Sequence, residues 1–201
     1  EIMKQLGAKG QNFEIRINNR RLVNYIFQDY LKLSQDNVYL LTKLVDKKEK
    51  MSREDFSHSL REIAPEQFEK ILEVLEVSDL TELPSEIKET QGYKEIAQLF
   101  ELLPERAITN FRFVPSLMRG FDYYTGNVFE VFDTSSVNNR SLFGGGRYDD
   151  LVGIFDTESV TAFGFGMGDV TVRDYLETYD LLPDYTSQTQ LYVCKLDSKQ
   201  S

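Results

Sequence analysis

Residues 117–133 read LMRGFDYYTGNVFEVFD, and this stretch decides how the chain is expected to fold. The run from Phe121 to Phe132 places apolar and polar side chains on both of its alternating faces. A strand with one solvated face would alternate more cleanly between the two kinds of residue. The pattern therefore predicts a central strand whose polar side chains point into a lined cavity.

An arginine stands at the entry of this predicted strand. Arg119 precedes Gly120 and presents five donors in a planar arrangement that suits a phosphate or a carboxylate. The alternative is a surface ion pair between Arg119 and Asp122, worth under about 1 kcal/mol. Taken alone, this stretch favours the surface pair.

A second stretch, SLFGGGRYDDLVG at residues 141–153, contains three consecutive glycines. Glycine inside a strand costs conformational entropy and offers no side chain to pack. Close approach of a ligand would offset that cost, and Arg147 and Tyr148 place a cation and a phenol beside the bare backbone. The alternative is a glycine bulge or a hairpin loop with exposed side chains.

In a third stretch, FGFGMGDVTVRDYLE at residues 163–177, glycine alternates with bulky apolar residues. The glycines are Gly164, Gly166 and Gly168. A strand here would carry a bare face, on which a flat aromatic ring such as adenine could lie, and a face that packs. A helix should follow, with Asp169 or Thr171 as its cap.

The rest of the chain divides by its periodicity. NFEIRIN (12–18) alternates like a half-buried strand, and RRLVNYIFQDYL (20–31) has the spacing of an amphipathic helix. From about residue 38 to residue 103 there is one glycine and the apolar residues recur at helical spacing, which predicts a small helical unit. TQLYVCKLD (189–197) has the pattern of a lone strand.

Composition excludes several kinds of chemistry. One cysteine, Cys194, cannot form an internal disulfide, and with the single His58 it cannot build a structural zinc site. His58 is predicted to be a solvated helix residue. The net charge of −10 means that most contacts to any nucleic acid should lie outside this chain. The absence of a long apolar run or a secretory start predicts a cytoplasmic protein without a membrane partner.

Together, RGFDYYTG, GGGRYDDLVG and AFGFGMG resemble the motifs of histidyl-tRNA synthetases, a family of class II aminoacyl-tRNA synthetases. The earlier FEIRINNRRLV and LVDKKEK also look like parts of this family. The resemblance covers nearly the whole chain and is strongest over residues 117–168. It implies an α+β fold: part of the class II synthetase antiparallel sheet with flanking helices and a small helical insertion.

The resemblance also divides the chain into four segments. These are residues 1–39 as part of the catalytic core, 40–106 as a helical insertion, 107–183 as the core with the histidine and ATP site, and 184–201 as a linker and the first strand of an anticodon-binding domain. The family's first two motifs are expected before residue 1. The chain is thus expected to be a fragment that is inactive alone.

The resemblance implies a role for each matching residue. Arg119 would be catalytic and would contact the α-phosphate of ATP. Tyr124 and Tyr148 would surround the imidazole of histidine. The substrate-binding residues would come from RGFDYYTG and GGGRYDDLVG: Tyr123, Tyr124, Gly144, Gly145, Gly146, Arg147 and Tyr148. The adenosine would lie on Gly164, Gly166 and Gly168. ATP would be a substrate accompanied by Mg²⁺, with no metal site on the protein.

The implied activity is ATP-dependent formation of histidyl-adenylate followed by transfer to tRNA(His), by a homodimer. The family's third motif usually carries an arginine where this sequence has Thr171, and Arg173 would point about 200° away around the helix. One alternative is a non-catalytic paralogue with a regulatory or tRNA-sensing role, although such paralogues generally lose the arginine and tyrosines kept here. The other is an α+β domain without a site.

Overall fold

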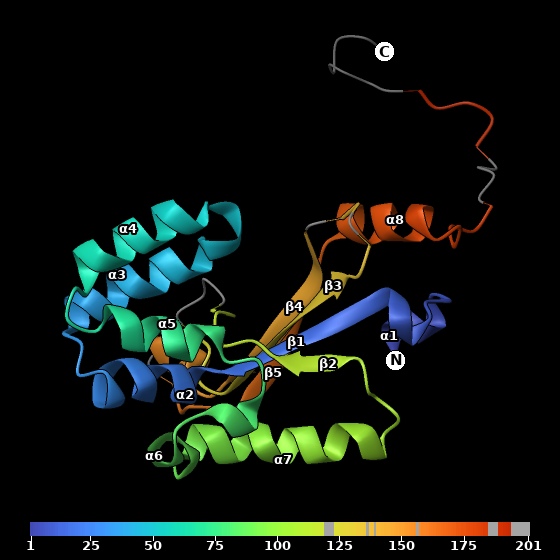
Figure 1. Cartoon of the computed structure of the whole chain (residues 1–201). Helices are drawn as coiled ribbons and strands as arrows, with labels where there is room; N and C mark the ends of the chain where they lie inside the picture. The colour runs from blue at the N-terminus through green and yellow to red at the C-terminus, as the bar shows by residue number, and fades with distance from the viewer. Residues whose placement is uncertain (119–122, 136, 139, 156, 185–188, 194–201) are drawn as a thin grey trace, which may run out of the picture.

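The computed structural model describes residues 1–118, 123–135, 137–138, 140–155, 157–184 and 189–193. Arg119 and Gly120, the first two residues of RGFDYYTG, therefore lie outside the described residues. Figure 1 shows a sheet flanked by helices, with a group of helices to one side of it. The fold is α+β, as predicted.

Five strands form one sheet. They are β1 (Phe13–Asn19), β2 (Phe111–Phe113), β3 (Asn127–Asp133), β4 (Ser141–Tyr148) and β5 (Ala162–Met167). Their order is β2-β1-β3-β4-β5, so β3 is the central strand that the sequence predicts. The pairing of β1 with β2 is parallel and the other three pairings are antiparallel, which makes the sheet mixed where an antiparallel one was expected.

The helices lie in three groups along the chain: before β1, between β1 and β2, and after β5. The α-helices are α1 (Ile2–Gln5), α2 (Arg20–Tyr25), α3 (Gln35–Asp46), α4 (Arg53–Ile63), α5 (Phe68–Glu76), α6 (Ser85–Lys88), α7 (Gln91–Glu105) and α8 (Asp169–Thr178). Shorter turns are η1 (Gly10–Asn12), η3 (Lys48–Lys50), η4 (Leu80–Glu82) and η5 (Leu151–Phe155), and a π-helical segment, η2 (Ile26–Tyr30), continues α2.

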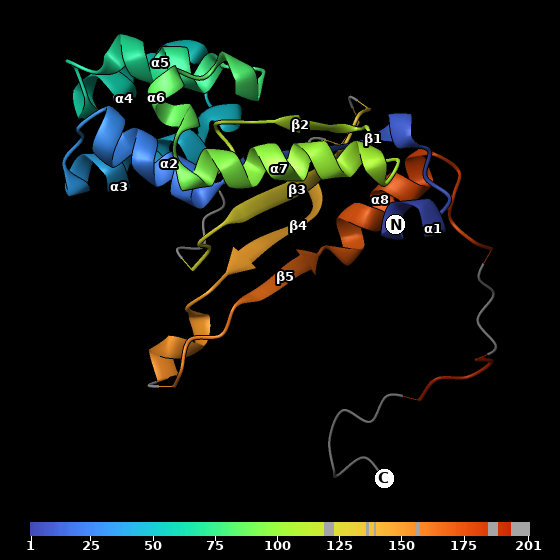
Figure 2. The ribbon, with the colours of Figure 1, turned by 90° about the horizontal axis from the view of Figure 1, so that it is seen from below.

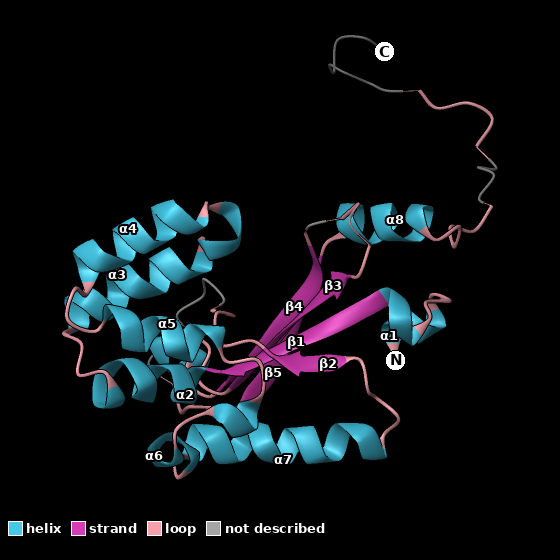
Figure 3. Ribbon diagram, viewed as in Figure 1, coloured by secondary structure: helices cyan, strands magenta, loops and turns pink. Residues whose placement is uncertain are grey.

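The predicted helical unit contains α3 to α7, shown in cyan in Figure 3. Ser34, Ser52 and Thr90 cap three of these helices by accepting hydrogen bonds from backbone amides. The apolar stripes meet in a core that includes Leu41, Leu60 and Ile71. His58 lies on α4 with a 77% exposed side chain, in accord with the prediction of a solvated position.

The two faces of the sheet differ in character because residues that pair side by side share a face. One face, here called the packed face, carries Phe13, Ile17, Val131 and Phe143. Ile17 shares a core with Ile96 and other residues of α2 to α7, whereas the other three share a core with residues of α8. Figure 2 shows α7 running across β1 and β3.

The opposite face, here called the open face, carries polar residues and glycines. One row across it joins Arg16, Glu130, Gly144 and Gly166 on β1, β3, β4 and β5. The next row joins Val128, Gly146 and Gly164. Glycine and bulky apolar residues occupy opposite faces of β5, as predicted. The prediction that the apolar face packs was wrong, because Phe163, Phe165 and Met167 at this edge of the sheet are 63%, 49% and 39% exposed.

Two local predictions were wrong. The strand β3 begins at Asn127, so Tyr123 and Tyr124 lie in the loop before it and do not follow the strand's alternation. The helix α8 begins at Asp169 with Gly168 as its N-cap and has no side-chain cap. The Thr171 hydroxyl instead donates to the carbonyl oxygens of Leu142 and Gly168, at 3.2 and 3.1 Å.

Near the end of the chain, residues 191–193 belong to no strand and are exposed, and residues 194–201, including Cys194, lie outside the described residues. Within the described ranges, none of the helices combines the length and apolarity required to cross a lipid bilayer.

Candidate functional site

Three tyrosines gather where the loop before β3 meets the end of β4. The ring centroids of Tyr123 and Tyr124 are 4.6 Å apart, and Tyr148 is 5.6 Å from the first and 6.4 Å from the second. Tyr124 is 5% exposed, and it packs with Val114, Leu117 and Val128. The structure thus brings together three predicted site residues from two separate motifs.

Two of the glycines make room for these rings. A Cβ at Gly146 would lie 2.9 Å from Cδ1 of Tyr124, and a Cβ at Gly164 would lie 3.0 Å from the hydroxyl of Tyr148. Both distances are shorter than ordinary van der Waals contact. The tyrosines therefore lie directly against the open face at these two positions.

The other predicted glycines differ in their surroundings. A Cβ at Gly166 would meet no atom within 4 Å among the described residues, so the open face is bare there. Gly144 lies beside Gly166 in the same row and is buried. Gly145 faces the packed side, where a Cβ would collide with the carbonyl oxygen of Gly164. Gly168 is the N-cap of α8.

The carboxylate of Asp149 joins β4 to the described part of the loop before β3, residues 123–126, here called the tyrosine loop. It accepts hydrogen bonds from Thr125 Oγ1 at 2.7 Å, from Arg147 Nε at 2.9 Å and from an Arg21 guanidinium nitrogen at 3.1 Å. The hydrogen bonds from Thr125 and Arg147 lower the pKa of Asp149 to about 2, so the group is charged at neutral pH. Arg147, a predicted substrate-binding residue, is therefore paired with Asp149.

Buried amides hold the neighbouring backbone. Asn18 Nδ2 donates to the carbonyl oxygens of Pro115 and Leu117, at 3.0 and 3.2 Å, and so fixes the segment that leads into the first motif. Asn19 caps α2 and donates to Asn127 at 2.7 Å and to Glu95 of α7 at 2.9 Å. Both asparagines are at most 1% exposed.

These asparagines and Asp149 lie beside the candidate site, and the sequence patterns did not single them out. The sequence signal that could have indicated the asparagines is the Asn18–Asn19 pair, which ends an amphipathic strand directly before a helix. Polar side chains that a fold buries are usually fully hydrogen-bonded, and the partners here are up to 128 positions away in the sequence. Such partners cannot be identified from local spacing.

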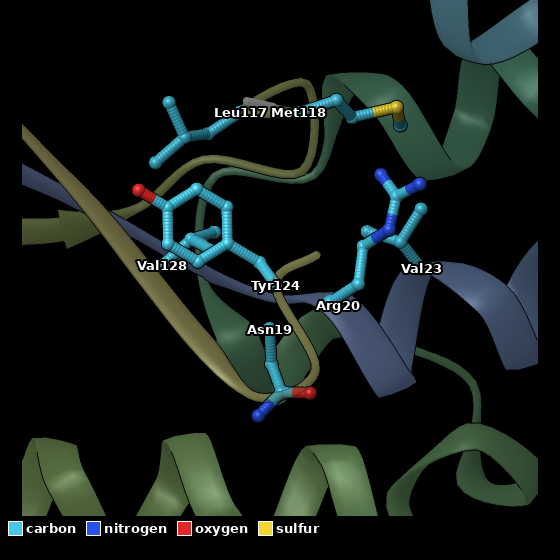
Figure 4. A pocket seen from close by; sticks show the side chains of 7 residues that line it. All are labelled: Asn19, Arg20, Val23, Leu117, Met118, Tyr124 and Val128. Carbon is cyan, nitrogen blue, oxygen red and sulfur yellow. The ribbon is translucent and has the colours of Figure 1, made fainter. Parts of the chain in front are cut away.

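A small cavity lies on the α2 side of Tyr124. Figure 4 shows the tyrosine ring next to Val128, with Leu117 and Met118 on one side and Asn19 and Arg20 on the other. A larger, more polar recess of about 600 Å³ lies beyond Tyr123 and Thr125, against the turn that contains Asp150 and Ser159. Tyr124 thus borders the small cavity and Tyr123 borders the larger recess.

Within the described ranges, no group of three His, Cys, Asp or Glu residues is placed to hold a metal ion. The polar groups near the tyrosines are instead hydroxyl, amide, carboxylate and guanidinium groups. Such groups can orient an amino acid and a nucleotide by hydrogen bonds and charge.

Comparison with known proteins gives a consistent result. The sequence profile described as histidyl-tRNA synthetase matches residues 1–170. The histidine–tRNA ligase of Leptospira biflexa is 36% identical over 203 residues, covering 98% of this chain and 46% of that protein. The chloroplastic/mitochondrial histidine–tRNA ligase of Arabidopsis thaliana is 30% identical and covers 98% of this chain and 41% of that protein.

Solved structures agree in fold. The histidyl-tRNA synthetase of Nostoc sp. PCC 7120 superimposes with a TM-score of 0.77 at 25% identity, over 90% of this chain and 45% of that one. A Bacillus halodurans protein titled ATP phosphoribosyltransferase regulatory subunit/histidyl-tRNA synthetase has a TM-score of 0.67 at 21% identity, over 86% of this chain and 47% of that one, and shows the fold alone.

The chain spans less than half the length of the curated relatives that it matches. Within that span the match is nearly continuous, and it includes the tyrosine loop, the glycine strands and the segment around Asp149. This chain belongs to the histidyl-tRNA synthetase family.

Proposed function

We propose that the full-length protein containing this chain is a histidine–tRNA ligase. The observation that carries the proposal is the tyrosine cluster, which lies against the glycines of β4 and β5 and is followed on the same face by bare backbone at Gly166. Family membership and the names of the relatives support the same activity. The substrates are histidine, ATP with its Mg²⁺, and tRNA(His).

In this proposal Tyr124 and Tyr148 contact the imidazole of histidine, with Tyr123 beside them. The bare backbone at Gly166 accommodates the adenosine. Arg119 contributes the cation for the α-phosphate; its role rests on the sequence resemblance, because it lies outside the described residues. The protein acts as a homodimer in the cytoplasm, with residues 40–106 as the helical insertion and most tRNA contacts outside this chain.

The proposed first step is in-line attack of the histidine carboxylate on the α-phosphorus of ATP. A bond forms from a carboxylate oxygen to phosphorus, and the bond to the bridging oxygen breaks and releases pyrophosphate. A terminal ribose hydroxyl of the tRNA then attacks the histidyl carbonyl carbon and AMP leaves. The protein contributes mainly orientation and charge stabilisation, which account for most of the rate in phosphoryl transfer.

Histidine-dependent exchange of pyrophosphate into ATP by the full-length protein tests the proposal. Exchange with histidine, and with no other amino acid, is the expected result. The second candidate is a non-catalytic paralogue, and Thr171 at the usual position of the third-motif arginine favours it. Its hydroxyl is bonded to the carbonyls of Leu142 and Gly168. Binding of histidine without exchange would favour this candidate.

The role of Arg119 gives a sharper test. We expect Arg119→Ala to lower the adenylation rate by on the order of a hundredfold or more, with a much smaller change in ATP affinity, because the charge is needed most in the transition state. Arg173→Ala is the matched control: Arg173 is exposed on α8 and pairs with Glu177 at 2.9 Å, so exchange should be unchanged. Equal losses of rate and ATP affinity would contradict the assigned role.

A further inference from the structure

The two tyrosine segments converge on a single carboxylate. Thr125, which directly follows Tyr124, donates its hydroxyl to Asp149, and Asp149 directly follows Tyr148. We infer that Asp149 is a positioning residue, which sets the separation of the two phenols and thereby the selection of the histidine side chain. The inference rests on the proposed function, because it assigns a determinant of specificity to the same site.

Backbone contacts act in parallel with this bond. The amide of Thr125 donates to the carbonyl oxygen of Arg147 at 2.9 Å, so the loop is joined to β4 through both the main chain and a side chain. Gly126 also donates its amide to the Arg147 carbonyl at 3.4 Å and accepts from the Arg20 amide at 2.9 Å, and β3 begins only at Asn127. The Asp149 carboxylate adds a side-chain anchor to these backbone bonds.

Asp149 is itself held by cations on different elements. Arg147 Nε reaches it from β4, and Arg21 reaches it from α2. Arg21 also pairs with Glu95, so the chain of charges continues to α7. An acceptor fixed by two guanidinium groups has a defined position, because each charge-assisted bond is short and directional.

The geometry of the phenols depends on this anchor. The Tyr124 and Tyr148 centroids are 6.4 Å apart, and each ring lies against a glycine of the sheet. Loss of the Thr125–Asp149 bond would leave the loop joined to β4 by backbone hydrogen bonds alone. Tyr124 could then shift relative to Tyr148, which stays with β4. A displacement of about 1 Å between orienting groups is enough to cost on the order of a hundredfold in reactivity.

The test compares three variants of the full-length protein by histidine affinity, measured by calorimetry, and by KM values in pyrophosphate exchange. Asp149→Asn keeps the shape and removes the charge. Thr125→Val removes the donor, whereas Thr125→Ser retains it. We expect Asp149→Asn and Thr125→Val to weaken histidine binding by on the order of tenfold and to leave the KM for ATP nearly unchanged. Thr125→Ser should restore binding.

Asp133→Asn is the matched control. Asp133 also accepts hydrogen bonds from Ser135, Asn138 and Tyr179, but it lies at the opposite end of β3. A general loss of stability would affect this variant as well. Histidine binding should nevertheless be unchanged in Asp133→Asn.

The outcomes separate the inference from the proposed function. Unchanged histidine affinity in Asp149→Asn and Thr125→Val overturns the inference and leaves the ligase proposal standing. An equal loss in Asp133→Asn also overturns it, because the effect would then be structural. If the wild-type protein binds histidine without exchange, the ligase proposal fails and the affinities still decide the inference. If it does not bind histidine, both fail. If Asp149→Asn does not fold, the Thr125 pair decides.

Discussion

A hydrogen-bonded aspartate lies near each end of the central strand β3, but the two differ in their partners. At the Asn127 end, Asp149 accepts from Thr125, Arg147 and Arg21, which belong to three different parts of the chain. At the other end, Asp133 accepts from neutral donors, two of them in the turn that follows it. A carboxylate bonded by cations thus lies beside the candidate site, whereas the carboxylate at the other end is bonded by the adjoining turn and by Tyr179.

The surroundings of the two carboxylates also differ. Burial raises the pKa of Asp133, but the hydrogen bonds from Ser135, Tyr179 and Asn138 outweigh this effect and hold its pKa below the usual value. Beside it, burial raises the pKa of Tyr175, whose hydroxyl has no hydrogen-bond partner among the described residues. The Asp133 end thus contains a buried hydroxyl without a partner among the described residues, although recesses lie at both ends of β3.

Among these substitutions, one in the sheet between the two ends of β3 should destabilise the fold most, because it disturbs both ends. A Cβ at Gly145 would lie 2.6 Å from the Cα of Phe165 and would force β4 and β5 apart. We expect Gly145→Ala to lower the free energy of unfolding by roughly 3 kcal/mol, measured by urea denaturation. Gly166→Ala is the control and should change it by less than about 1 kcal/mol, since the space there is open. Equal costs would contradict the close approach.

Two tyrosines test the Asp133 end: Tyr175 lies within α8, and Tyr179 is the C-cap of the same helix. Tyr179 donates its hydroxyl to Asp133 at 2.7 Å, so Tyr179→Phe should lower the free energy of unfolding by about 1.5 kcal/mol. Tyr175→Phe removes a buried hydroxyl without a partner in the described structure and should be neutral or stabilising by about 1 kcal/mol. Thermal and urea unfolding would measure both. A loss in Tyr175→Phe as large as in Tyr179→Phe would show that Tyr175 has a partner.

The smallest expected effect is on pH dependence. The pKa of Asp149 falls from its usual 3.8 to about 2 in the folded chain, so its stabilisation is complete above about pH 4 and is lost as the pH falls towards 2. We expect Asp149→Asn to flatten the decline in the free energy of unfolding over that interval. Asp133 continues to contribute in the same direction. A decline as steep as that of the wild type would contradict the lowered pKa.

Much of the fold follows from local patterns. The strand over residues 13–19, the helices between residues 38 and 103 and the glycine strand β5 were each predicted from periodicity, which reflects the geometry of one face of one element. The position of β3 in the centre of the sheet was also predicted. The start of β3 was misplaced, because Tyr123 and Tyr124 extend the apolar pattern into a loop.

The glycines show where local reasoning reaches its limit. The sequence indicated that something approaches them closely. In the structure, tyrosine rings lie against Gly146 and Gly164, and the β5 backbone crosses Gly145, whereas the space at Gly166 is open. The residue type is the same in all four cases, and only the neighbouring strands and loops distinguish them.

The family resemblance, the order of elements and the residues available for the site follow from motifs and periodicities, which are local properties of the chain. Packing of the sheet and helices is what brings Tyr124 to Tyr148 and bonds Asp149 to Thr125 and Arg21. It also joins α7 to this network through Glu95. Asp149 lies 128 positions from Arg21 along the chain, and a contact over that separation forms only when the sheet and helices have packed.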